Sequence, residues 1–528
     1  MKNRQIPVVV TVITLAAVAA CSTASGKTSG SSPRATTFTV AELEPASFVP
    51  GKDDGIAGDE LNALFAPLTK FDAKNHLTYV QASSVIPNAT ATVWTITIRP
   101  GWKFQDGEPV TAQSYVNAWN ATAYGPNAWA GNGDFTGIEG YAALNPPSGE
   151  PAARTLPGAR VLSATTIQVR LTHPDSQFPQ ELSLPGFLPL PGAYFKDPAA
   201  WEAKPIGDGP FEVSRTWQPN KSLTMVRYAA YQGQRPTAGG ITFEIYTSEA
   251  AAYTALQAGQ VDITAIGPTT YAAAERDMPS DVVAYAAPAV DYLGFPLYNA
   301  YFGNKLIREA ISLAIDRATI TRVLYAGLAV PASAILPPAE DGAPLNVCAY
   351  CGYDPARAHH LLAQAGGWKG PLVLWYPTGL GYDQAAKAIA NDLSQNLDIR
   401  VTLDAVPVTS WFASLAGKKV TNGIYIGHWG AYFPSMQNTL ASLFETSGTG
   451  YVESWYSTPA LTKVINAGDG ATSPAVAQAY YRQAEQMIMA AFPVVPLYDR
   501  DYVYVHTSAV TNVIIDCNQI ELSDVAVR

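Results

Sequence analysis

Charged residues are scarce in this chain, and those present do not gather into runs. The 528 residues contain 33 Lys and Arg against 43 Asp and Glu, which gives a formal net charge of −10. No Lys/Arg-rich segment occurs in the sequence. General binding to nucleic acid needs a basic surface, so this acidic balance argues against a nucleic-acid partner.

The sequence also lacks the short motifs that carry common enzyme chemistry. It contains no Gly-x-Ser-x-Gly elbow, no His-Glu-x-x-His pair, no Walker-type phosphate loop and no dinucleotide-binding glycine fingerprint. Its 6 histidines share no metal-ligand spacing. We therefore expect no catalytic residues, no metal and no cofactor.

Cysteine is rare, with 4 residues in the chain. Three of them are Cys348, Cys351 and Cys517. Oxidising conditions outside the cytoplasm favour disulfides, so Cys348 could pair with Cys351, or one of the two could pair with Cys517. Zinc is disfavoured because a four-ligand site would need a second pair of ligands at suitable spacing.

One apolar run stands at the start of the chain. Residues 6–20 follow the basic residues Lys2 and Arg4, and this apolar segment is too short and too interrupted to span a bilayer. A basic start followed by a short apolar segment is typical of a signal peptide, which we predict over residues 1–20. The ending Val-Ala-Ala-Cys21 resembles the lipobox of bacterial lipoproteins, which predicts an acylated Cys21 followed by a flexible Ser/Gly/Thr linker over residues 21–34. We expect an anchor on the outer face of the cell membrane.

The rest of the chain is rich in apolar, aromatic and turn-forming residues. Hydrophobic residues make up 48%, aromatic residues 11%, and there are 41 glycines and 40 prolines. Such a chain is globular and is too long for a single core, so we expect about two to four domains. Residues 93–99 and 497–505 alternate as strands do, and Thr111 can cap a helix that runs to about Ala123.

The stretch from Val282 to Gly327 is the most informative. Its first part is extended, and its second part predicts one helix that is capped by Asn304 and stopped by Gly327. Apolar residues between Leu306 and Ile315 form one stripe. Five charged residues are expected off this stripe: Lys305, Arg308, Glu309, Asp316 and Arg317.

Five blocks of sequence resemble the family 5 extracellular solute-binding proteins, the peptide-binding subunits of ABC importers. They are WTITIRPGWKFQDGEPVTAQSYVNAW, GDGPFEVSRTWQPNKSLTMVRYAAYQG, LQAGQVDI, LIREAISLAIDRATITRVLYAG and YDPARAHHLLAQAGGW. The resemblance covers about residues 37–513. It implies an α/β, two-lobe periplasmic-binding-protein-like fold (type II, cluster C) with an extra β-rich subdomain in the first lobe. The expected parts are a lobe I core over 35–67, 205–290 and 497–528, an inserted subdomain over 68–204, and lobe II over 291–496.

The same resemblance implies a ligand site between the lobes. In the family, a Trp-x-Ala-Asp-Tyr-Pro pattern supplies the carboxylate that takes the amino terminus of a peptide. Residues 429–434 read WGAYFP, so Tyr432 stands where the family has its acid. A tyrosine hydroxyl carries no charge near neutral pH. Either another acid substitutes, with Glu44, Asp499 and Asp501 as candidates, or the ligand lacks a free amine.

Six residues are predicted to contact the ligand. Core packing is the alternative for each aromatic residue, and a structural hydrogen bond is the alternative to metal binding for the histidine. The six are Glu44, Tyr425, His428, Trp429, Tyr432 and Tyr498.

The resemblance therefore implies a lipid-anchored receptor that captures a peptide or other small solute. Its partners would be the permease and ATPase subunits of an ABC transporter, and the membrane that holds Cys21. Two alternatives stay open. The same fold could bind a non-peptide such as an oligosaccharide, since aromatic residues are abundant, or the protein could be a surface lipoprotein used in sensing or adhesion.

Overall fold

The computed structural model describes residues 37–53, 55–378, 380–431, 433–445, 454–516 and 519–528. The predicted signal peptide, the linker and Cys21 lie outside the described residues, as do Tyr432 and Cys517.

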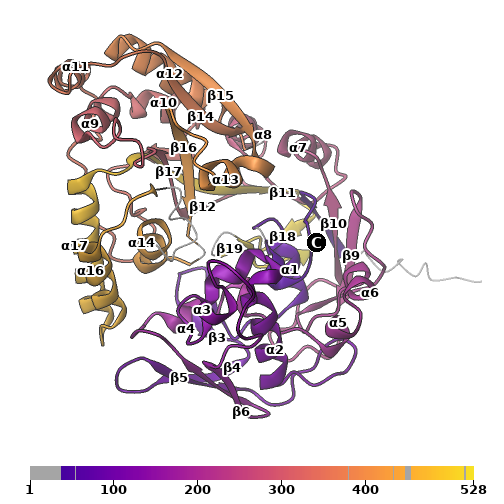
Figure 1. Ribbon diagram of the computed structural model, residues 1–528. Coiled ribbons are helices and arrows are strands. Elements are labelled where there is room, and N and C mark those ends of the chain that lie inside the picture. Colours follow the sequence, from indigo (N-terminus) through magenta and orange to yellow (C-terminus); the bar gives the residue numbers. More distant parts are fainter. Residues whose placement is uncertain (1–36, 54, 379, 432, 446–453, 517–518) are drawn as a thin grey trace, which may run out of the picture. The chain divides into compact units, whose positions relative to one another are not determined.

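A large mixed sheet runs through the described chain (Figure 1). Its strands are β1 (Thr37–Glu42), β8 (Phe211–Val213), β9 (Ser222–Arg227), β10 (Gly240–Ile245), β11 (Ile263–Ala265), β12 (Val282–Gly294), β13 (Ala329–Pro331), β14 (Leu372–Thr378), β15 (Val401–Pro407), β16 (Gly423–Gly430) and β17 (Val495–His506). The order is β15-β14-β16-β12-β17-β11-β1-β10-β9-β8, and β13 pairs with β17. The two long strands, β12 and β17, therefore join elements built from the first half of the chain to elements built from the second half.

A smaller antiparallel sheet lies in the segment predicted as the insert. Its strands are β4 (Ala82–Pro87), β5 (Val93–Ile98), β6 (Ala159–Ser163) and β7 (Thr166–Arg170), in the order β4-β5-β7-β6. In β5 the side chains of Trp94, Ile96 and Ile98 are buried and alternate with partly exposed ones, which confirms the predicted strand. Short pairs complete the β structure: β2 (Thr69–Phe71) with β3 (Leu77–Tyr79), β18 (Val510–Thr511) with β21 (Ala526–Val527), and β19 (Ile515–Asp516) with β20 (Gln519–Ile520).

Helices fill the connections between the strands. The α-helices are α1 (Gly58–Leu64), α2 (Ala112–Ala123), α3 (Tyr141–Leu144), α4 (Phe178–Glu181), α5 (Gly192–Lys196), α6 (Pro198–Ala203), α7 (Glu249–Gln257), α8 (Pro268–Asp277), α9 (Lys305–Leu313), α10 (Arg317–Leu324), α11 (Pro355–Gln364), α12 (Asp383–Leu397), α13 (Val408–Ala416), α14 (Met436–Phe444), α16 (Pro459–Asp469) and α17 (Pro474–Ala491). The described residues also form the 3-10 helices η1 (Pro50–Lys52), η2 (Gly125–Asn127), η3 (Ala130–Phe135) and η4 (Pro185–Phe187). Within the described residues, none of the helices is both long and apolar enough to cross a membrane.

The region predicted as one helix up to Gly327 is two helices, so that prediction was wrong. The predicted cap is present, because the Asn304 side chain accepts from the Leu306 N–H at 3.1 Å. The chain then leaves helical geometry after α9, and the carboxylate of Asp316 caps α10 by accepting from the Thr319 N–H at 3.0 Å. An aspartate inside a helical pattern marks a new start because its side chain competes for backbone N–H groups.

Three of the charged residues expected off the apolar stripe, Arg308, Glu309 and Arg317, are nevertheless buried. Arg308 donates to the carbonyls of Phe492 at 2.7 Å and Ala491 at 2.9 Å. These contacts tie α9 to the end of α17, so the buried guanidinium satisfies carbonyls that a helix end leaves without partners.

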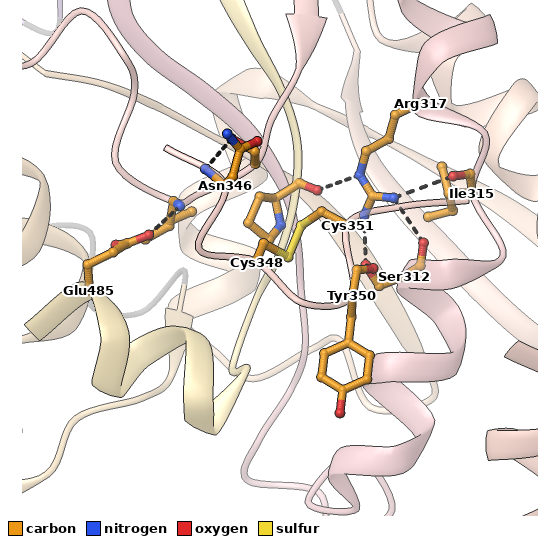
Figure 2. Close-up of a disulfide and its surroundings, with 11 residues drawn as sticks. Ser312, Ile315, Arg317, Asn346, Cys348, Tyr350, Cys351 and Glu485 are labelled. Atoms are coloured by element: carbon orange, nitrogen blue, oxygen red, sulfur yellow. Dashed lines mark hydrogen bonds between the residues drawn. A yellow bond between two sulfur atoms is a disulfide. The ribbon is translucent and has the colours of Figure 1, made fainter. Parts of the chain in front are cut away.

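Arg317 likewise donates to a backbone carbonyl, at the start of β17. Figure 2 shows its guanidinium between Ser312 and Ile315, and its Nε donates to the carbonyl of Pro496 at 2.8 Å. The Ser312 hydroxyl donates in turn to the Tyr350 carbonyl at 2.7 Å. Beside this network Cys348 and Cys351 form a disulfide (Figure 2), which selects one of the two pairings left open.

The cap that separates α9 from α10 can be tested by mutation. Asp316→Ala removes the acceptor for the Thr319 N–H and should lower the free energy of unfolding by about 1 kcal/mol. Asp316→Asn retains a capping oxygen and should stay close to the wild type. Urea unfolding followed by circular dichroism measures both, and equal losses in the two variants would show that the cap does not stabilise the fold.

Candidate ligand-binding site

A cavity of about 1670 Å³ opens among segments that are far apart in the sequence. Residues within 42–53, 55–71, 130–134, 183–188 and 231–234 contribute to its lining, together with 428–431, 500–504, Asp516 and 519–523. Pockets for drug-sized ligands usually measure roughly 300–1,000 Å³. The cavity therefore has room for a ligand larger than a typical small metabolite, or for a smaller ligand with water.

Strand register places a set of polar side chains on one face of the sheet beside this cavity. Asp291 of β12 lies directly opposite His428 of β16 and opposite Tyr498 of β17. Because side chains alternate along a strand, Arg500 and Tyr502 share the face of Tyr498. His428, Arg500 and Tyr502 line the cavity, whereas Asp291 lies fully buried behind them.

The Asp291 carboxylate connects these side chains. Its Oδ1 lies 2.6 Å from Nδ1 of His428 and accepts from the Tyr382 hydroxyl at 3.0 Å. Its Oδ2 lies 3.5 Å from Nη1 of Arg500. Since a carboxylate accepts, the proton on His428 resides on Nδ1, and Nε2 is left for Tyr502, whose hydroxyl lies 3.5 Å away.

Arg500 is held on several sides. Its Nη1 also donates to the Tyr382 hydroxyl at 3.3 Å, and its guanidinium carbon lies 5.9 and 5.8 Å from the ring centroids of Tyr325 and Tyr382. Burial disfavours the charged form, but Asp291 together with Tyr382, Tyr325 and Tyr498 outweighs it, and the pKa of Arg500 is raised well above its ordinary range. Arg500 is thus a permanently charged side chain with a fixed orientation.

Carboxyl groups occupy another part of the wall. Glu42 and Asp59 both line the cavity, and Asp59 accepts from the Ile520 N–H at 2.8 Å. Burial raises the pKa of Asp59 to about 6, and burial together with Asp59 raises the pKa of Glu42. Around neutral pH the pair therefore tends to hold a proton, which reduces the negative charge on that side of the cavity.

The predicted ligand residues on β16 and the loop after it have different surroundings. His428 and Trp429 line the cavity. The Trp429 indole N–H donates to Oγ1 of Thr439 at 3.0 Å, so the ring is anchored from behind. Tyr425 is fully buried in a cluster with Trp411 and lies against Gly294, where an added Cβ would come within 2.1 Å of its ring. Tyr432 lies outside the described residues.

Glu44 and Tyr498 are also set back from the cavity. Glu44 accepts from the Asn220 N–H at 2.8 Å and supports that turn. Tyr498 is fully buried, with its hydroxyl 2.6 Å from the hydroxyl of Tyr325. Of the acids considered as substitutes at the position of Tyr432, Asp501 lines the cavity. Contact between the ligand and any of the six residues stays a prediction.

The residues that sequence reasoning missed are Asp291, Tyr382 and Arg500. Asp291 and Arg500 belong to segments that were predicted as strands, yet neither has a motif of its own. The alternation in LYDRDYVYV does put Arg500 on the face of Tyr498, and this was the available signal. Their convergence depends on the pairing of β12 with both β16 and β17, which no local pattern encodes.

Comparison with known proteins identifies the family. The model described as "Bacterial extracellular solute-binding proteins, family 5 Middle" matches residues 80–451. The chain belongs to this family. Among curated relatives, the periplasmic murein peptide-binding protein MppA of Escherichia coli (strain K12) is 26% identical over 475 residues, covering 86% of each chain. The glutathione-binding protein GsiB of Salmonella typhi is 24% identical over 433 residues, covering 79% of this chain and 80% of the relative.

Solved structures show the same fold. The Escherichia coli murein tripeptide binding protein MppA matches with a TM-score of 0.79 at 22% identity, covering 93% of this chain and 98% of the other. Haemophilus influenzae OppA in complex with the peptide RPPGFSPFR matches with a TM-score of 0.79 at 20% identity, covering 93% and 99%. The predicted α/β two-lobe fold is thereby confirmed. The residue boundaries proposed for the lobes and the insert stay predictions.

A buried acid beside the site gives a test of pH dependence. Asp499 has an Oδ1 that is buried without a hydrogen-bond partner among the described residues. Burial, with Asp291, Asp501 and Glu485 nearby, raises its pKa from 3.8 to about 8. An unfolded aspartate ionises near pH 4, so this group makes stability fall as the pH rises from about 4 to about 8.

Asp499→Asn removes that titration. Its melting temperature should therefore fall less between pH 5 and pH 8 than that of the wild type, as measured by differential scanning calorimetry. Asp404→Asn on the edge strand β15 is the matched control and should keep the wild-type slope. An unchanged slope in Asp499→Asn would contradict the raised pKa.

Proposed function

We propose that this protein captures peptides in the cavity and delivers them to the permease of an ABC transporter. The observation that carries the proposal is the cavity itself, which is large, lies beside β16 and β17, and has fixed charged and aromatic groups in its wall. The names of MppA and OppA support peptides as the ligand class, since both are described as binding or holding peptides. No chemical change of the ligand is part of the proposal.

The composition of the wall favours a peptide over an oligosaccharide. Aromatic side chains such as Trp102 and Tyr231, with ring centroids 5.4 Å apart, suit either ligand. Arg500, Glu42 and Asp59 are charged or ionisable groups of the wall. A neutral sugar would bring no charge to the Arg500 donors that Asp291 and Tyr382 leave unused, and charge-assisted hydrogen bonds are the stronger ones. A peptide brings charged ends and a backbone with hydrogen-bonding groups.

Capture and release require that the lobes move. β12 and β17 are the long strands that cross between them, and the structure holds them together over much of their length. In the proposed mechanism a ligand that contacts both lobes favours the closed state, because it binds that state more tightly. The permease then receives the ligand when the lobes open.

Peptide capture predicts a loss of affinity in variants of the cavity wall. Native mass spectrometry of the mature chain with a synthetic tripeptide library should show retained peptides, whereas a dextrin library should show none. His428→Gln should weaken retention about fivefold, the worth of one hydrogen bond of roughly 1 kcal/mol. His359→Gln on the exposed side of α11 is the matched control. Retention of dextrins with no peptide would favour the oligosaccharide alternative.

The anchor is a separate proposal that concerns residues outside the described part. The lipobox-like sequence before Cys21 supports acylation of that cysteine, and the linker over residues 21–34 would leave the body free to meet its permease. One acylated cysteine with more than one chain supplies stable membrane attachment.

Replacement of Cys21 by Ser should release the protein from the membrane. The variant should appear in the soluble fraction after fractionation, and its mass should lack the lipid. Cys348→Ser, which disrupts the disulfide pair but not the lipobox, is the control and should stay with the membrane. A Cys21→Ser protein that still pellets with membranes would refute lipid anchoring at this residue.

A further inference from the structure

Arg500 has more hydrogen-bonding capacity than its neighbours use. A guanidinium has five N–H donors. Within the described residues only Nη1 has acceptors, namely Asp291 and Tyr382, and no described residue accepts from Nε or Nη2. The side chain is 21% exposed and lines the cavity. Donors of a charged group are thus left at the wall of a site that takes ligands.

The surroundings fix this arginine in place. Asp291 and Tyr382 hold one edge of the guanidinium, while the rings of Tyr325 and Tyr382 lie within cation–π distance, at 5.9 and 5.8 Å. Tyr382 is itself bound to Asp291, so the support does not depend on a flexible surface residue. A group held in this way loses little conformational freedom when a ligand binds.

Resting on the proposed function, we propose that Arg500 is a specificity-determining residue that binds a carboxylate of the ligand. A planar guanidinium and a planar carboxylate form two parallel N–H···O hydrogen bonds that are strengthened by their opposite charges. A neutral amide or hydroxyl of a ligand cannot form such a charge-assisted pair. The preferred ligands are therefore peptides with a free carboxyl group, at the C-terminus or on an acidic side chain, directed toward β17.

The neighbouring groups agree with this assignment. Because the proton of His428 lies on Nδ1, its Nε2 accepts from the Tyr502 hydroxyl and offers no donor to a ligand carboxylate, so the guanidinium is left to bind that carboxylate. Asp291 is covered by His428, Arg500 and Tyr382 and is fully buried, so the ligand meets the cation before it meets the acid behind it. The Glu42 and Asp59 pair lies against the Tyr504 side of the wall, further along β17.

The test compares two tripeptide libraries of the same sequences, one with a free C-terminal carboxylate and one with a C-terminal amide. Acidic side chains are omitted from both. Retention on the mature wild-type protein is measured by native mass spectrometry and competition. The free acids should bind roughly 10- to 100-fold more tightly than the amides, which corresponds to a charge-assisted hydrogen bond.

Arg500→Met should abolish this ratio of affinities, because it weakens binding of the free-acid peptides and leaves binding of the amides nearly unchanged. Arg500→Lys should keep part of the ratio, because it retains the charge without the planar fork. Arg276→Met, at an exposed residue of α8 that is paired with Asp277, is the matched control and should keep the full ratio. A merely structural role for Arg500 would weaken both libraries equally and would overturn the proposal.

The remaining outcomes are also decisive. Equal retention of acids and amides by the wild type overturns carboxylate recognition but leaves peptide capture standing. If Arg500→Met keeps the wild-type ratio of acid to amide affinity, the carboxylate is recognised by another residue, and the role of Arg500 is overturned. Retention of neither library refutes peptide capture, and the assignment of Arg500 falls with it.

Discussion

The buried carboxylate of Asp291 is the constraint on which this wall of the cavity depends. A charge removed from water must be paired and hydrogen-bonded, and Asp291 obtains its partners from β16, from β17 and from Tyr382 at the start of α12. Each of these side chains is thereby held in one orientation. His428 and Arg500, the two that reach the cavity, are oriented by an interaction that the ligand itself does not touch.

Buried charged groups that hold their hydrogen-bond partners in place also occur in the elements that support the wall. Arg308 and Arg317 are buried and donate to carbonyls at the end of α17 and the start of β17. They fix the entry of the strand that carries Arg500. The strand is therefore positioned at its start by backbone contacts of arginines and in its middle by Asp291, while its register with β12 sets which side chains share a face. A rigid wall of this kind suits a binding protein, because the ligand need not order it.

Local patterns in the sequence account for much of the fold. The alternation in residues 93–98 and the cap at Asn304 both predicted elements that are present, since each depends on neighbours along the chain. The single helix up to Gly327 was mispredicted because an aspartate in its middle can act as a cap, and periodicity alone does not reveal that. Burial of Arg308 and Arg317 was missed for a related reason, because their acceptors are carbonyls 184 and 179 residues away along the chain.

The site was harder to predict than the fold. Family resemblance pointed to residues 428–432, and His428 and Trp429 do line the cavity. The resemblance gave no reason to select Asp291 or Arg500, because their importance arises from cross-strand pairing. Tyr425 and Tyr498 show the converse, since aromatic residues beside a site can be buried in the core beneath it. Sequence indicates which strands border the ligand, whereas the register decides which side chains face it.

The most direct measurement is a crystal structure of the freshly purified protein with the ligand that it retains. We predict peptide density in the cavity with a carboxyl group within hydrogen-bonding distance of the Arg500 guanidinium and with Asp291 still bound to His428. A ligand held at another wall, with Arg500 turned away and Asp291 separated from its partners, would contradict the central claim that this buried carboxylate organises the binding site.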